Sequence, residues 1–140
     1  MTQPSLTQIE DWARQAGKIL SSGYGSLHAI GHKGVTDLVT EMDRQSEDLL
    51  VSLIRKSFPS HTILTEESGL LEAEHSHKVW YVDPLDGTTN YAHHLPIFSV
   101  SIAYAEDGVL QLGLVYDPMR DECFSAQRGK GATLNGKPMH

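Results

Sequence analysis

The chain has 140 residues, of which 39% are hydrophobic and 21% charged, and it carries a formal net charge of −7. This length and balance are typical of one soluble globular domain with a single core. The acidic balance disfavours nucleic acid and anionic membranes as partners.

The opening residues lack the basic and then apolar order of a signal peptide. No later apolar run approaches the length that crosses a membrane, so the cytoplasm is the expected location.

The first third of the chain predicts two helices. Ser5 or Thr7 could cap a first helix, which the glycines of segment 23–25 would end. A second helix is expected from about Glu41 to Ser57, stopped by Pro59. The apolar face of the first helix would carry Ile9, Trp12, Ala13, Ala16, Ile19 and Leu20.

From Thr62 onward the pattern predicts strands. Apolar, β-branched and aromatic residues recur in five runs, at 62–65, 79–82, 98–105, 110–116 and 123–127. Segment 106–108, Glu-Asp-Gly, is typical of a hairpin turn between two of them. Two helices followed by such a meander predict an α+β fold, with the helices packed on a mainly antiparallel sheet. The single cysteine, Cys123, is expected to be a small core residue.

Segment 80–91 (WYVDPLDGTTNY) is the most informative, because an apolar strand runs directly into two carboxylates. Pro84 removes a ladder donor and Gly87 permits a turn. Asp83 and Asp86 can then both point inward, with the Leu85 carbonyl between them. Carboxylate and carbonyl oxygens without cysteine suit a hard cation, and Mg²⁺ better than zinc. The segment therefore predicts a magnesium site.

The residues after this turn predict a phosphate site. Thr88, Thr89 and Asn90 are good N-cap residues, so a short helix would begin here with free backbone N–H groups. The simpler alternative is a turn that only reverses the chain, since Asp-Pro also occurs at 117–118 without such a cluster. The octet 83–90 is much richer than a turn and favours the site.

Two further acidic segments lie upstream. A predicted strand runs into Glu66 and Glu67, which repeats the placement of carboxylates at a strand end before a turn. Asp37 and Asp43 are expected to flank the start of the second helix. Taken singly, each of these acids is more often a cap or a solvated surface residue. Several acids that converge on one point would repel each other and would bind a cation strongly.

Taken together, these motifs resemble the inositol monophosphatase family. The matching segments are DPLDGTTN at 83–90, EES at 66–68 and DLVTEMD at 37–43, with Lys33 also in place. Segments 95–103 and 128–136 look like the strands and turns that follow in that family. The resemblance covers nearly the whole chain. It implies that residues 1–140 form one unit, the N-terminal metal-binding half of a layered sandwich.

The resemblance also implies the metal ligands. Glu66, Asp83 and the Leu85 carbonyl would hold a first Mg²⁺ ion. Asp86 would bind a second ion, which Asp83 would share with the first. One departure matters: the family continues into a second half, whose Trp-Asp motif supplies a further aspartate to the second site, and this chain contains no candidate for that motif.

The same resemblance implies how water and phosphate are held. Thr88 would lie beside the attacking water, with Asp43 accepting its hydrogen bond, and Glu66 would help to polarise that water. The amides of Gly87 and Thr88 would hold the phosphate. The substrate-binding residues would thus be Asp86, Gly87 and Thr88, and the supporting residues Lys33, Asp37 and Glu67.

The activity implied by the resemblance is magnesium-dependent hydrolysis of a small phosphorylated alcohol by two-metal activation of water, with inhibition by lithium. Segment 89–91 looks like the branch that acts on inositol monophosphate. Relatives that cleave fructose bisphosphate or histidinol phosphate share this half, so they remain alternatives. A non-catalytic remnant or assembly partner is another.

A phosphatase of the haloacid dehalogenase type is the alternative from a different family. Its two aspartates are separated by one residue, whereas two residues separate Asp83 and Asp86 here. Without a second half, the sheet should expose apolar surface, so we expect the chain to self-associate or to bind a complementing C-terminal half.

Overall fold

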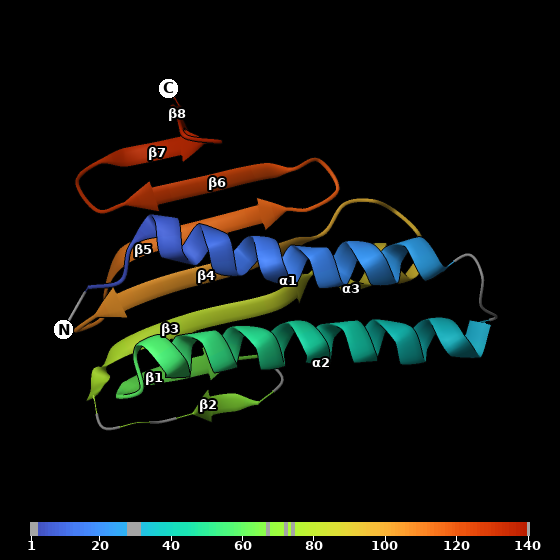
Figure 1. Cartoon of the computed structure of the whole chain (residues 1–140), viewed down its shortest axis with the longest axis horizontal. Helices are drawn as coiled ribbons and strands as arrows, with labels where there is room; N and C mark the ends of the chain where they lie inside the picture. The colour runs from blue at the N-terminus through green and yellow to red at the C-terminus, as the bar shows by residue number, and fades with distance from the viewer. Residues whose placement is uncertain (1–2, 28–31, 67, 72, 74, 140) are drawn as a thin grey trace.

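In the computed structural model, which describes residues 3–27, 32–66, 68–71, 73 and 75–139, two long helices cover one face of a single sheet (Figure 1). The helices are α1 (Leu6–Ser26), α2 (His32–Ser57) and the short α3 (Thr88–Ala92). The strands are β1 (His61–Thr65), β2 (Gly69–Leu71), β3 (His75–Asp86), β4 (Ser99–Glu106), β5 (Val109–Asp117), β6 (Glu122–Gln127), β7 (Gly131–Leu134) and β8 (Lys137–Pro138). Within the described ranges, no helix is both long and apolar enough to cross a membrane.

Helix α1 begins where the sequence predicts but continues further. Ser5 is the N-cap and accepts a hydrogen bond from the Gln8 backbone at 3.2 Å. The prediction that the glycines at 23–25 end the helix is wrong, because α1 runs through them to Ser26. A Cβ on Gly23 would lie 2.3 Å from the Met42 sulfur, so glycine permits close packing of α1 on α2. Packing therefore outweighs the low helix propensity of glycine.

Helix α2 ends at Ser57 as predicted, but it begins at His32 rather than near Glu41. Asp37 and Asp43 therefore lie inside this helix instead of flanking its start. Val35, Leu38 and Val39 explain the difference, since they pack against the core and extend the apolar stripe of α2 toward its N-terminus.

The sheet has the strand order β2-β1-β3-β4-β5-β6-β7-β8 and is mainly antiparallel, as predicted. Among the described strands, only β1 and β3 pair in parallel. The hairpin turn after β4 is confirmed, and both Asp107 and Gly108 have positive φ there. Strand β3 is longer than the predicted 79–82 and reaches Asp86 through a register shift after Asp83. Strands β2 and β8 are additional to the prediction, whereas β7 lies in segment 128–136, which the resemblance assigns to strands and turns.

The core lies between the helices and the sheet, around the side chain of Trp80. This indole is fully buried and has ring centroids of Trp12, Phe58 and Tyr104 within 5.7 Å of its own. Its Nε1 donates a hydrogen bond to His61 Nδ1 at 3.0 Å, so its polar atom is satisfied. Cys123 is buried, as expected, and burial raises the pKa of its thiol to about 12.

Candidate functional site

The site is built where β3 ends. Asp83 pairs with Ser101 and Asp86 pairs with Ser99, so two residues on β3 lie opposite one on β4. This bulge removes Pro84 and Leu85 from the regular ladder and separates the two carboxylates. The Leu85 side chain is only 2% exposed, which anchors the bulge in the core.

The Asp83 carboxyl lies in an environment that resists its ionisation. Burial raises its pKa above the ordinary value, and the negative charges of Asp86 and Glu66 raise it further. A hydrogen bond from the Leu85 backbone acts in the opposite direction. The Oδ1 atom is buried and accepts no hydrogen bond from the described residues. An added cation would satisfy this oxygen and would reduce the repulsion between the three carboxylates.

These donors fit Mg²⁺ by chemistry, since all of them are hard oxygens. No three His, Cys, Asp or Glu side chains of the described segments are grouped as a metal-ligand cluster. The assignment of Glu66, Asp83, Leu85 and Asp86 as ligands therefore stays a prediction from the motif.

The predicted short helix after the turn is confirmed as α3, which begins at Thr88. Its N-cap is Gly87 rather than a threonine or asparagine. Gly87 has φ 95°, and a Cβ at this position would lie 2.9 Å from the Ile97 carbonyl oxygen. Both observations require glycine, because any side chain would be strained and crowded here. The turn thus keeps the backbone between Asp86 and Thr88 bare.

The structure brings Asp43 and Thr88 to the same cavity, although 45 positions separate them in the chain. This cavity has a volume of about 510 Å³. It is lined by Val39, Thr40, Asp43, Arg44, Glu47, Asp48, Ser68 and Thr88. Asp86 and Gly87 line a different cavity of about 340 Å³, together with Asn90 and Asp117. Asp43 and Thr88 thus line one cavity, and the hydrogen bond between them that the resemblance implies stays a prediction.

The remaining predicted residues whose side chains the structure describes line neither of these two cavities. Glu66 is exposed after β1, and its charge reaches Asp83. Asp37 is exposed on α2. Lys33 lies in the first turn of α2, and its side chain is outside the described part of the structure. Glu67 lies outside the described residues.

Sequence reasoning missed two polar residues of α2, Ser46 and Glu47, which are both buried beside the site. A signal was present, because Ser46 interrupts the apolar stripe that Met42 and Leu50 continue on either side. A polar residue at such a position indicates a specific hydrogen-bond partner.

Comparison with protein families decides the ancestry of this arrangement. The family model described as "Inositol monophosphatase family" matches residues 1–140. The chain belongs to the inositol monophosphatase family. This confirms the resemblance and places the α+β fold and its carboxylate-rich turn in a family of phosphatases.

Individual proteins and solved structures are also similar to this chain over almost its whole length. The Nus factor SuhB of Escherichia coli is 48% identical over 135 residues, which are 95% of this chain and 51% of that protein. The crystal structure of extragenic suppressor protein suhB from Bartonella henselae has a TM-score of 0.87 and 36% identity, over 96% of this chain and 52% of that one. An inositol monophosphatase from Anabaena (Nostoc) has a TM-score of 0.80 and 42% identity, over 96% and 48%. The chain therefore spans about half the length of these relatives.

Proposed function

We propose that this chain carries the magnesium-dependent part of a phosphatase that hydrolyses a small phosphorylated alcohol, with inositol monophosphate as the first candidate. The observation that carries the proposal is the Asp83 carboxyl, whose buried Oδ1 accepts no hydrogen bond from the described residues and whose pKa is raised by burial, Asp86 and Glu66. A divalent cation would supply the missing partner of this oxygen and would favour the ionised form of the carboxyl.

The roles follow from the chemistry of each group. Glu66, Asp83, Asp86 and the Leu85 carbonyl would hold Mg²⁺, which when bound supplies charge for activating water and stabilising the leaving oxygen. Lithium would inhibit by taking the place of one of these ions. The backbone amides at Gly87 and Thr88 would hold the phosphate oxygens.

Thr88 is assigned the placement of the attacking water. Its hydroxyl donates to Asp43 across the shared cavity in this proposal, which leaves a lone pair to orient the water. A water that is held in this way lowers the entropy cost of the chemical step and leaves the binding of the metal unaffected.

Replacing Thr88 by alanine should therefore slow turnover much more than it weakens metal binding. We expect kcat to fall by about 10²-fold or more with the apparent Mg²⁺ affinity changed little. The check is steady-state phosphate release at a series of Mg²⁺ concentrations. Thr88→Ser, which keeps the hydroxyl, should retain most of the activity. An equal loss in the serine variant would contradict the role given to the hydroxyl.

The proposed function is tested by phosphate release from inositol 1-phosphate by the 140-residue chain, with and without Mg²⁺. Fructose bisphosphate and histidinol phosphate are the comparison substrates, because relatives that act on them share this half. Magnesium-dependent release that Asp83→Asn loses would support the proposal. If the folded chain releases no phosphate, the assay is repeated with a C-terminal half supplied, and continued inactivity would overturn the catalytic assignment.

A second candidate is a non-catalytic assembly role. The observation that favours it is the 48% identity to a protein named as a Nus factor. Metal binding without turnover, in the presence of the second half, would favour this candidate over the phosphatase.

The sheet face turned away from the helices supports a proposal about partners. Neighbouring residues in a strand point to opposite faces of the sheet. Trp80 and Tyr116 are buried on the face under the helices, so their neighbours Tyr81 and Val115 lie on the other face. Tyr81 and Val115 are 42% and 40% exposed. They lie among Ala103, Gly113, Phe124 and Ala126, which line an apolar hollow of about 290 Å³. Such a face is suited to cover by another polypeptide.

We therefore expect the isolated 140-residue chain to self-associate through this face. Sedimentation velocity should show species larger than a monomer, and Val115→Lys should shift the distribution toward monomer. A C-terminal half added in trans should compete with self-association. A monodisperse wild-type monomer with a sharp thermal transition would contradict the expectation.

A further inference from the structure

Two neighbouring residues on α2 are polar and yet buried. Ser46 is 0% exposed and Glu47 is 5% exposed. Both belong to α2, the helix that packs against β3 and β1 (Figure 1). A buried hydroxyl or carboxylate destabilises the fold unless specific partners satisfy it. The partners of these two residues therefore indicate what they are for.

Ser46 reaches the turn that carries Asp83 and Asp86. Its Oγ donates a hydrogen bond of 2.8 Å to the Pro84 carbonyl, and this contact is buried. Pro84 lies in the bulge of β3, where the regular ladder is interrupted. The bond fixes the orientation of the peptide group that joins Pro84 to Leu85. Ser46 thus sets the backbone between the two predicted metal-binding carboxylates.

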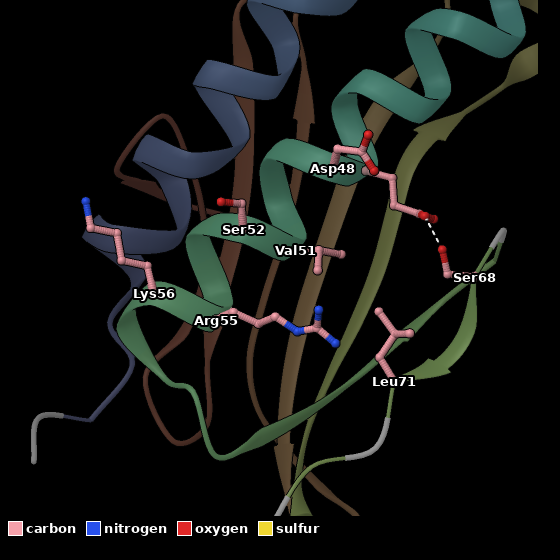
Figure 2. A pocket seen from close by; sticks show the side chains of 8 residues that line it. Asp48, Val51, Ser52, Arg55, Lys56, Ser68 and Leu71 are labelled. Carbon is pink, nitrogen blue, oxygen red and sulfur yellow. Dashed lines mark hydrogen bonds between the residues drawn. The ribbon is translucent and has the colours of Figure 1, made fainter.

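Glu47 reaches the other turn, which carries Glu66. Its Oε2 accepts a hydrogen bond from the Ser68 hydroxyl, drawn as the dashed line in Figure 2. The Ser68 backbone N–H donates to Thr65 Oγ1 at 2.9 Å, so one bond holds Ser68 to the end of β1 and the other holds it to α2. Figure 2 shows Ser68 facing α2 from the segment that leads to Leu71. Glu47 thus sets the position of the turn in which Glu66 stands two residues before Ser68.

The second oxygen of Glu47 supports a role beyond packing. Oε1 is buried and has no hydrogen-bond partner among the described residues. Glu47 also lines the cavity that holds Asp43 and Thr88. A carboxylate kept for stability alone is expected to have both oxygens satisfied.

We propose that Ser46 and Glu47 are positioning residues, which together hold the Glu66 turn and the Asp83–Asp86 turn at the separation that binds a divalent cation. The two residues are adjacent on one rigid helix, and each bonds to one turn. Neither residue is assigned as a ligand. The inference rests on the proposed metal site, because it concerns how that site is held.

The test measures cation affinity, not turnover, on the 140-residue chain. Mn²⁺ is the probe, since it prefers the same octahedral oxygen ligands as Mg²⁺, and its free concentration is read by electron paramagnetic resonance. Ser46→Ala and Ser68→Ala should each raise the Mn²⁺ Kd by about 10- to 100-fold, which is the usual effect of removing a residue that holds metal ligands in place without binding the metal itself. Ser68→Thr restores the hydroxyl and should restore the Kd. Ser52→Ala, an exposed serine on the same helix, is the matched control.

A double-mutant cycle tests the pair directly. The combined variant Glu47→Gln with Ser68→Ala should raise the Kd by less than the product of the two single effects, because both changes break one contact. Circular dichroism confirms that each variant is folded at the temperature of measurement. An unchanged Kd in folded Ser46→Ala and Ser68→Ala would overturn the inference while leaving the metal site in place. Absence of Mn²⁺ binding by wild type would overturn the metal site and the inference with it.

Discussion

Asp83→Asn should abolish stabilisation of the chain by Mg²⁺ and, with it, magnesium-dependent phosphate release. Asparagine keeps the size of the side chain and one oxygen, but it removes the charge that both proposed ions share. The loss of affinity should exceed the roughly 10- to 100-fold that follows removal of an outer-shell partner. Thermal unfolding with and without Mg²⁺ measures it, because a ligand that binds only the folded state raises the midpoint.

The same substitution should leave the metal-free chain at least as stable as wild type. Burial and the charges of Asp86 and Glu66 disfavour the ionised Asp83, so a neutral side chain removes an unfavourable interaction. Asp11→Asn is the matched control, because this aspartate is exposed on α1 and lines neither cavity of the site. If Mg²⁺ raised the unfolding midpoint of Asp83→Asn as much as that of wild type, the assignment of Asp83 as a ligand would be wrong.

Trp80→Ala should cause the largest loss of global stability among single core substitutions. The indole is fully buried between α1, the end of α2 and β4, with Tyr104 at 4.7 Å between ring centroids. Truncation of a buried tryptophan to alanine lowers the free energy of unfolding by about 3–5 kcal/mol. Urea unfolding followed by circular dichroism measures this loss.

Trp80→Phe separates packing from hydrogen bonding in the same experiment. Phenylalanine retains most of the aromatic contact but leaves His61 without the indole N–H, so the loss should be smaller than for alanine. The position matters for the site, since Trp80 stands three residues before Asp83 on β3. A change below about 1 kcal/mol for alanine would show that the core closes around the gap and that Trp80 does not anchor the strand.

The local features of the fold could be predicted from the sequence because they depend on a few adjacent residues. Ser5 at the start of α1, the end of α2 at Ser57 and the turn at 107–108 are such features. Each follows from capping, from proline or from glycine in a single turn of chain. The start of α2 was predicted nine residues too late, because the core contacts of Val35, Leu38 and Val39 are not local.

The sequence by itself determined which chemical groups the proposed site contains. The octet at 83–90 contains the carboxylates, the bare turn at Gly87 and the hydroxyl of Thr88 within one short segment, so residue type and spacing suffice to predict a cation and phosphate site. Because all these groups lie within eight consecutive residues, the segment also indicates the family.

Only the tertiary structure decided which distant residues serve that segment. Asp43 meets Thr88 at one cavity, and Ser46 bonds to Pro84 across 38 positions of the chain. These contacts depend on where α2 packs against β1 and β3, which is set by burial of a whole apolar face and not by any local signal. The partner of a hydroxyl or carboxylate on α2 can therefore be identified only from the packing of the helix on the sheet.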